Sequence, residues 1–140
     1  MQLDLLFAFV SEQFLLVLAL MATFVMLFIH ESRKAGPSLT PQEAITLVNR
    51  EGGIFLDIRD AAEFKRAHIA DAKHITLAQL SSRLGELDKY REQPVVVVCK
   101  LGQSAAGATK LLRAQGFDQA RKMTGGMMEW NALKLPVVAQ

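Results

Sequence analysis

The feature that most restricts the fold of this chain is an uncharged apolar stretch near its amino terminus, FLLVLALMATFVMLFI at residues 14–29. As a helix, these residues would rise about 24 Å, which is less than the roughly 30 Å of a bilayer's hydrocarbon core. If the apolar residues from Leu5 join it, residues 5–29 are long enough to cross a membrane, with Glu12 inside the span. We therefore predict one transmembrane helix within an anchor at residues 1–30, which contacts membrane lipid through residues 5–29.

The flanks of this stretch bear on its role. A helix that is apolar all round can also be a buried core helix, but the remaining residues form a domain too small to cover one this long. A cleaved signal peptide would begin with a basic region, whereas Asp4 is the only charged side chain before Glu12. Arg33 and Lys34 follow the stretch, and positive charge marks the cytoplasmic side of a span. These charges predict a single-pass protein of a membrane, a bacterial inner membrane, with its carboxyl-terminal domain in the cytoplasm.

Charge and cysteine content limit the partners of the rest of the chain. The net charge of the chain is +2. Residues 31–140 contain all 16 basic and 12 of the 14 acidic side chains. This mild excess favours small anions or a membrane surface, and the scattered basic residues argue against a nucleic-acid partner. Cys99 is the only cysteine, so an intrachain disulfide is excluded. Its thiol is then a free thiol, a small buried hydrophobe or a nucleophile.

After the apolar stretch the sequence changes from a membrane pattern to that of a globular domain. Residues 31–39 are predicted to be a tether, because a charged run is followed by Gly36-Pro37. The domain is expected to occupy residues 40–138.

This domain alternates strand and helix patterns. Thr40 is the expected N-cap of its first helix, with Pro41 at the first position and Glu43 completing a capping box. The later expected elements are a strand at 54–58, a helix at 61–66, a strand at 75–77, a helix at 80–87, a strand at 95–98, a helix at 105–115, a strand at 119–123 and a short last helix bearing Trp130. This order predicts an α/β fold, with a parallel sheet flanked by helices.

Cys99 directly follows the VVVV run of the predicted central strand. Ligands of open α/β sheets bind at the carboxyl ends of the strands. Gly102 permits a tight turn after the strand, and the helix after Ser104 would direct its positive end toward the sulfur. Backbone N–H groups in such a loop favour a thiolate and bind anions, and Lys100 adds to their field if its side chain turns inward. The pattern predicts a nucleophilic cysteine in an anion-binding loop, with a buried structural cysteine as the alternative.

Three motifs in order resemble the single-domain rhodaneses, a family of sulfurtransferases. CKLGQSA at residues 99–105 resembles their active-site loop, and GGMMEW at residues 125–130 is similar to their closing Gly-Gly-x-x-x-Trp element. FLDIRDAAEFKRAHIADAKHI at residues 55–75 is similar to their amino-terminal signature, in which the matching residues are Asp57, Arg59, Glu63, His68 and Ile69. The motifs cover nearly all of residues 40–138. The resemblance implies a rhodanese-like domain preceded by one transmembrane helix.

The resemblance also implies a reaction and a site. Cys99 would take a sulfane sulfur from a donor such as thiosulfate, become a persulfide and pass the sulfur to a thiophilic acceptor. The donor would be a small sulfur-containing anion or a protein persulfide, bound by Lys100, Leu101, Gly102, Gln103 and Ser104. Asp57 and Arg59 are expected to support the site by tying the first strand to nearby loops. No cofactor and no metal are expected.

Some positions depart from the family's pattern. Ser104 stands where many of these loops carry an arginine, and Ala67 and Asp71 stand where glycines are frequent. Related phosphatases clamp phosphate with an arginine six positions after the cysteine, and Ala105 occupies that position here, so phosphatase activity is not expected. His68 is expected to make a structural hydrogen bond rather than to act as a base.

Two function classes follow from these observations. The first is a membrane-anchored sulfurtransferase of the rhodanese type. The second is a rhodanese-like interaction module with negligible turnover, which the anchor favours because it implies a membrane-protein partner. Trp130 and the methionines at 123, 127 and 128 are expected to pack in the core in either case.

Overall fold

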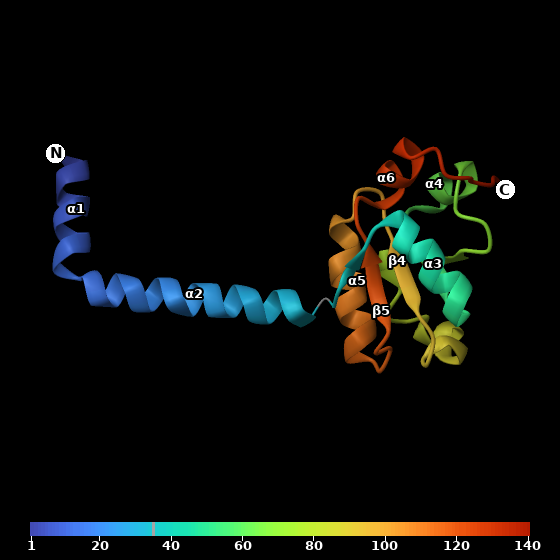
Figure 1. Ribbon diagram of the computed structural model, residues 1–140, viewed down its shortest axis with the longest axis horizontal. Coiled ribbons are helices and arrows are strands. Elements are labelled where there is room, and N and C mark those ends of the chain that lie inside the picture. The colour runs from blue at the N-terminus through green and yellow to red at the C-terminus, as the bar shows by residue number, and fades with distance from the viewer. Residues whose placement is uncertain (35) are drawn as a thin grey trace. The chain divides into compact units, whose positions relative to one another are not determined.

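The computed structural model describes residues 1–34 and 36–140, which divide into two compact units, Met1–Arg33 and Lys34–Gln140. The first unit consists of helices α1 (Gln2–Glu12) and α2 (Phe14–Lys34) (Figure 1). Part of the predicted tether, Ala35, lies outside the described residues. Since α2 continues to Lys34, the first residues of that tether are helical rather than extended.

The apolar stretch forms most of α2, but the expected single helix from Leu5 to Ile29 is divided at Gln13, where the backbone leaves helical geometry. The break falls in the polar segment Ser11-Glu12-Gln13, where the Ser11 hydroxyl donates to the carbonyl of Ala8 at 2.8 Å. Within the described part of the chain, one helix is long and apolar enough to cross a membrane, the 20 residues of Phe14–Arg33. The sequence predicted that Glu12 lies inside the span. In the structure Glu12 precedes the candidate span.

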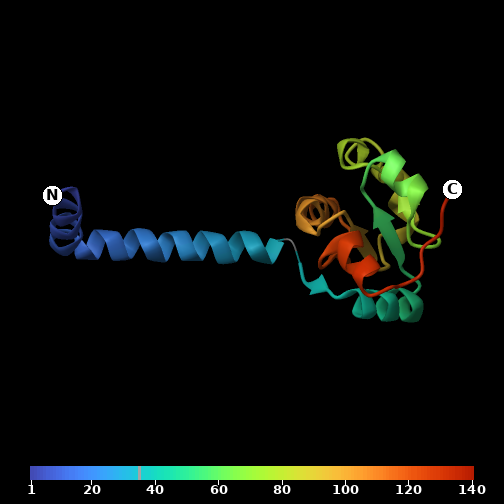
Figure 2. The same ribbon diagram turned by 90° about the horizontal axis from the view of Figure 1, so that it is seen from above.

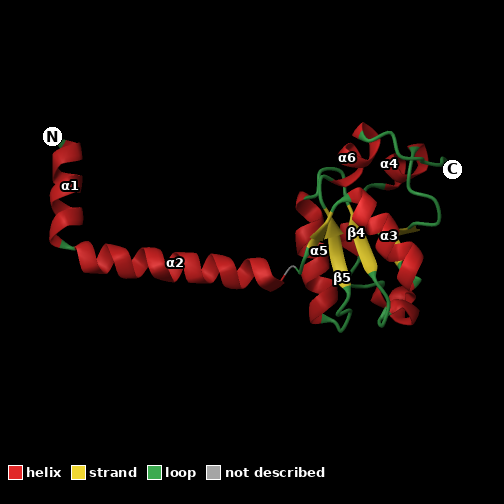
Figure 3. Ribbon diagram, viewed as in Figure 1, coloured by secondary structure: helices red, strands yellow, loops and turns green. Residues whose placement is uncertain are grey.

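The second unit is built on a parallel sheet, which among the described residues has five strands in the order β1-β5-β4-β2-β3. The strands are β1 (Ser38–Leu39), β2 (Ile54–Asp57), β3 (Lys73–His74), β4 (Val95–Val98) and β5 (Ala120–Met123). The α-helices are α3 (Pro41–Glu51), α4 (Ala61–Arg66), α5 (Gln103–Ala114) and α6 (Gly126–Ala132). Figures 2 and 3 show α5 on one face of the sheet and α3 on the other. The predicted α/β architecture is confirmed.

β4 lies at the centre of the sheet, hydrogen-bonded to β2 on one side and β5 on the other. Its four valines have no exposed surface. Val95 and Val97 join the core on the α5 face, and Val96 and Val98 join the core on the α3 face, because successive side chains of a strand point to opposite faces. A central strand buried on both faces fixes the position of the residue that follows it, which is Cys99.

The first helix of the domain begins as the sequence predicts. The Thr40 backbone N–H donates to the Glu43 carboxylate at 2.8 Å, and the Glu43 N–H donates to the Thr40 hydroxyl oxygen at 3.3 Å. The Thr40 backbone N–H, and after it the Thr40 hydroxyl, hold the pKa of Glu43 below its ordinary value. Both halves of the predicted capping box are therefore present, with Pro41 at the start of α3.

Two expected elements between β2 and β4 differ from the structure. The strand expected at residues 75–77 lies earlier, as β3 at Lys73–His74, and the helix expected at 80–87 is replaced by two 3₁₀ helices, η1 (Leu77–Gln79) and η2 (Leu84–Tyr90). The expected apolar positions Leu80 and Leu87 are nevertheless buried. Between the 3₁₀ helices the Ser82 hydroxyl donates to the Gln79 carbonyl at 2.9 Å, a local bond that competes with a regular α-helix.

The capping box predicts a pH-dependent contribution to stability. In Glu43→Gln the amide is a weaker acceptor for the Thr40 N–H, so the free energy of unfolding should fall at pH 7. Because the pKa of Glu43 is lowered by folding, this loss should be complete above about pH 4.3 and should vanish as the pH drops through the lowered pKa. Urea unfolding of residues 36–140 between pH 2.5 and 7 measures it. Glu51→Gln, at the other end of α3, is the control, and an equal pH dependence in the two variants would contradict the prediction.

Candidate active site

Cys99 directly follows β4, in the loop that leads to α5. Figure 1 shows this loop at the end of the sheet toward which the parallel strands run. Gly102 is the N-cap of α5 and has φ +90°, a left-handed conformation that glycine adopts without strain. This turn directs the Gly102 N–H toward the cysteine, and it donates to Sγ at 2.9 Å. The first-turn N–H groups of α5 have no partners within the helix, so the positive end of the helix dipole lies beside the sulfur. The predicted tight turn at Gly102 is therefore present, with its N–H directed at the sulfur.

The side chain of Cys99 is almost completely buried. Cys99 is only 4% exposed, and its side chain belongs to the core on the α5 face together with Val97 and Ala105. By contrast, the residues that follow it are exposed, with Leu101 at 48% and Ser104 on the surface. Cys99 continues the alternation of β4 onto the α5 face, where its side chain is buried, and the Gly102 N–H donates to the sulfur from the loop.

Lys100 does not turn toward the sulfur. Its ammonium nitrogen lies 3.6 Å from the carboxylate of Glu63 on α4, and the lysine side chain is 72% exposed. Glu63 belongs to the amino-terminal motif, and in the structure its carboxylate contacts the lysine that follows Cys99. Lys100 therefore joins the loop to α4, and the charge closest to the sulfur comes from the backbone.

The first turn of α6 supports the loop through two backbone hydrogen bonds. The Met127 N–H donates to the Cys99 carbonyl at 2.8 Å, and the Met128 N–H donates to the Lys100 carbonyl at 3.0 Å. The approach is so close that a Cβ atom on Gly126 would overlap the Cys99 carbonyl and would lie 2.7 Å from the backbone of Lys100. Gly126, at φ +57°, is therefore required both by its conformation and by the space available.

A second glycine contact joins the same two segments. A Cβ atom on Gly102 would lie 2.9 Å from the backbone nitrogen of Gly125. The sequence places Gly125-Gly126 in the closing motif, but it did not show that the pair packs against the loop of Cys99. Only the unusual doubling of glycine before a helix was available as a signal.

Asp57 and Arg59 form a buried ion pair beside β4. The Arg59 Nη2 donates to the Asp57 carboxylate at 2.7 Å, and the side chains are 8% and 2% exposed. Nη2 also donates to the carbonyl of Ala67 at 2.8 Å, after the end of α4. Asp57 pairs in register with Val98, one residue before the cysteine. The two residues tie the end of β2 to the α4 segment, which agrees with a supporting role.

His68 and the residues around it are occupied in structural contacts. His68 Nδ1 lies 2.7 Å from the Phe64 carbonyl, and the Phe64 ring stacks between the rings of His68 and His74. Asp71, which stands in place of a glycine, has φ +63° and takes the left-handed conformation that glycine would favour. Within residues 1–34 and 36–140, no group of three or more His, Cys, Asp or Glu side chains is arranged to hold a metal ion.

The remaining motif residues divide between core and surface. Trp130 is 2% exposed, packs edge-to-face on Phe55 and donates from Nε1 to the Pro136 carbonyl at 3.1 Å. Met123 and Met127 are buried as expected. Met128 is 63% exposed, so its predicted packing role is wrong. Met128 follows Met127 on α6 and points away from the core that Met127 fills.

Comparison with known proteins gives one consistent result. Residues 40–133 match the family described as the rhodanese-like domain. A thiosulfate sulfurtransferase, GlpE of Actinobacillus pleuropneumoniae serotype 3, is 34% identical over 99 residues, covering 71% of this chain and 90% of the relative. The polysulfide-sulfur transferase of Wolinella succinogenes is 30% identical with a TM-score of 0.66, covering 85% of this chain and 89% of its own. A rhodanese-related protein of Thermoplasma volcanium, at 23% identity and a TM-score of 0.67, shares the fold, covering 74% of this chain and 98% of its own.

The packing of α6 against the loop yields a test with a matched control. Gly126→Ala places a methyl group against the Cys99 and Lys100 backbone, whereas Gly52→Ala, at φ +70°, meets nothing within 4 Å. Gly52→Ala should cost about 1–2 kcal/mol of unfolding free energy from backbone strain alone. Gly126→Ala should cost about 1–3 kcal/mol more from overpacking, and it should change the rate at which iodoacetamide alkylates Cys99 under native conditions. Equal costs in urea unfolding, with unchanged alkylation in both, would show that the contact does not hold the loop.

Proposed function

Because this chain belongs to the rhodanese-like domain family, we propose that it is a sulfurtransferase that carries sulfane sulfur on Cys99 and is held at a membrane by its amino-terminal helix. The observation that carries the proposal is the hydrogen bond of 2.9 Å from the Gly102 N–H to Sγ of Cys99, at the junction of a central strand and a helix. Such donors lower the energy of a thiolate and of the anions that a sulfur transfer creates.

In the first half of the proposed reaction, the Cys99 thiolate attacks the outer sulfur of a donor such as thiosulfate. A sulfur–sulfur bond forms to Sγ as the donor's own sulfur–sulfur bond breaks, and sulfite leaves with the electron pair of that bond. The product is a Cys99 persulfide anion, and no proton is gained or lost. Negative charge stays close to the loop throughout, where backbone N–H groups of Lys100 to Ser104 stabilise it.

In the second half, a thiophilic nucleophile attacks the outer sulfur of the persulfide. With cyanide, a carbon–sulfur bond forms, thiocyanate leaves and the Cys99 thiolate is restored with the electron pair of the broken bond. A thiolate acceptor on a small molecule or a protein would react in the same way and would carry the persulfide onward. Because Leu101, Gln103 and Ser104 are exposed around the loop, a protein donor or acceptor can contact them directly.

The proposed binding residues contribute in different ways. Gly102 offers its N–H to the sulfur, and Ser104 adds a hydroxyl near the start of α5. Lys100 supplies positive charge at the rim of the loop, reduced by its contact with Glu63. Since no arginine side chain belongs to the loop sequence at residues 99–105, we expect weak affinity for a dianionic donor.

The membrane part of the proposal rests on α2. Its candidate span of 20 residues rises about 30 Å, the thickness of a bilayer core, and 0% of it is buried within the structure. Arg33 follows the apolar residues, which favours a cytoplasmic domain in a bacterial inner membrane. The proposed division is an anchor at residues 1–30, a tether at 31–39 and a rhodanese-like domain at 40–138.

One observation favours a second candidate function, a rhodanese-like interaction module at the membrane. Cys99 is 4% exposed, so a donor reaches its sulfur only from the side of the loop. A domain that has lost turnover keeps its fold and its loop, and then acts through its surface on a membrane-protein partner.

The enzyme and the module differ in one measurement. Residues 36–140 incubated with thiosulfate and desalted should gain about 32 Da, the mass of one retained sulfur atom, and should form thiocyanate when cyanide is added. Cys99→Ser, which is nearly isosteric, should gain no mass and fall to the uncatalysed rate. If the wild type also gains no sulfur from thiosulfate, polysulfide or a protein persulfide, the module is the better description.

The orientation proposed for the domain has its own test. Protease added to intact spheroplasts should leave the domain whole, because positive charge after the span retains it in the cytoplasm. After detergent lysis the same protease should cleave the chain at exposed sites. A periplasmic protein digested in the same sample shows that the protease was active, and digestion of the domain before lysis would reverse the orientation.

A further inference from the structure

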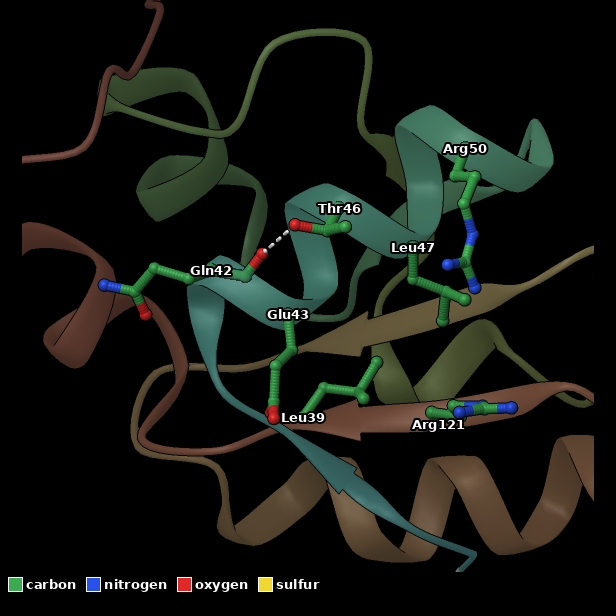
Figure 4. Close-up of a pocket in the computed structure, with 7 residues that line it drawn as sticks. All are labelled: Leu39, Gln42, Glu43, Thr46, Leu47, Arg50 and Arg121. Atoms are coloured by element: carbon green, nitrogen blue, oxygen red, sulfur yellow. Dashed lines mark hydrogen bonds between the residues drawn. The ribbon is translucent and has the colours of Figure 1, made fainter.

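A cavity of about 340 Å³ lies between α3 and the strands β1 and β5, and none of its lining residues belongs to the loop of Cys99 (Figure 4). Arg121 lines it from β5, where it pairs in register with Val96 of β4. Val96 lies three residues before Cys99, so the two places are separated by about 10 Å along the strand direction. The cavity is therefore a second feature of the domain and not an extension of the candidate active site.

Arg121, one of the lining residues, carries an unsatisfied donor. Its Nε is buried and has no hydrogen-bond partner in the structure, although the guanidinium group is permanently charged. A buried donor without an acceptor loses its hydration without compensation. An acceptor in the cavity would remove that cost if the Arg121 side chain turned to present its Nε–H, and this gives the site a reason to bind a ligand that has oxygen acceptors.

A second guanidinium group lines the same cavity. Figure 4 shows the Arg50 side chain extending from α3 toward β5, where Arg121 lies. Arg50 also forms an ion pair with Glu51 at 3.2 Å, but these side chains are 72% and 37% exposed, and exposed pairs are weak. Arg50 is thus able to turn its charge to an anion in the cavity at little cost.

The acidic side chain in the lining is already occupied. The Glu43 carboxylate accepts from the Thr40 N–H at 2.8 Å and from the Thr40 hydroxyl at 3.0 Å. These bonds lower the pKa of Glu43 and hold its charge at the start of α3. Two guanidinium groups against one committed carboxylate leave the cavity with a net positive charge.

We propose that this cavity binds a phosphoryl group, with the Arg121 side chain turning its unsatisfied Nε–H toward the oxygens and Arg50 closing over them from α3. The planar fork of a guanidinium group matches phosphate oxygens in geometry as well as in charge. The group could belong to a free phosphate compound or to the headgroup of an anionic phospholipid. The lipid source rests on the proposed anchor, since Leu39 lines the cavity and lies ten residues after Ile29, at most about 36 Å along the chain.

The test follows the Nε–H signal of Arg121 in ¹H–¹⁵N spectra of the full chain in nonionic detergent, assigned by its absence in Arg121→Gln. Inorganic phosphate and dioctanoyl phosphatidylglycerol are each titrated, with dioctanoyl phosphatidylcholine as the lipid control. Either anion should shift the signal to saturation. Calorimetry should then show at least tenfold weaker binding in Arg121→Gln, and Arg50→Gln should show a smaller loss. Whichever of the two anions binds more tightly identifies the source of the phosphoryl group, a free phosphate compound or a lipid headgroup.

Lys122→Gln is the matched control, because it removes one positive charge from the next residue of β5, whose side chain points to the opposite face. Its affinity should stay within twofold of wild type. No shift with either anion, or an equal loss in Lys122→Gln and Arg121→Gln, would overturn the proposal. Arg121→Lys, which keeps the charge but lacks Nε, guards against misfolding of the glutamine variant and should also bind at least tenfold more weakly. Sulfur transfer should be unchanged in all of these variants, so the result is independent of the chemistry of Cys99.

Discussion

The candidate active site depends on the backbone contact between the loop after β4 and the first turn of α6. Two N–H groups of α6 bond to the carbonyls of Cys99 and Lys100, and Gly126 provides the space for that approach. Because these carbonyls are held by α6, the peptide units of the loop have a fixed orientation, and the Gly102 N–H points at the sulfur. The closing motif, some 25 residues after the cysteine in sequence, is therefore part of the site's scaffold. A helix that contributes no side chain to the chemistry determines where the chemistry can occur.

The charged side chains near the site are mostly engaged with one another. Arg59 is committed to Asp57 in a buried pair, and Lys100 contacts Glu63 at the rim. The electrostatic field at the sulfur must then come from peptide dipoles, which need no counter-ion and cost nothing to reorganise during reaction. Such a site stabilises negative charge on a small sulfur atom without strongly holding a free dianion. This balance suits a carrier that accepts sulfur from one partner and releases it to another.

The sequence predicted what is decided locally and missed what is decided by distant contacts. The valines of β4 and the capping box at Thr40 were predictable because β-branched runs and capping residues act on their immediate neighbours. The break at Gln13 and the 3₁₀ helices before β4 lie within segments whose apolar residues continue on both sides, so a periodic pattern does not reveal them. The contact of Lys100 with Glu63 and the approach of Gly126 to Cys99 join segments far apart in the chain. The sequence left open whether Cys99 is buried, because its exposure depends on how α5 and the loop cover the end of β4.

Burial of Cys99 is compatible with the proposed role as a sulfur carrier, because the reacting atom of the loaded form is not Sγ. A persulfide places its outer sulfur about 2 Å beyond Sγ, the length of a sulfur–sulfur bond. The core residues around Sγ leave the loop as the direction in which this atom can extend, toward the N–H groups of Gly102 and the residues after it. In the proposed loaded form the outer sulfur would then lie nearer than Sγ to the exposed residues of the loop. Burial of Sγ therefore bears mainly on the first half of the proposed reaction, in which the thiolate itself meets the donor, and less on the second half, in which an acceptor meets the outer sulfur.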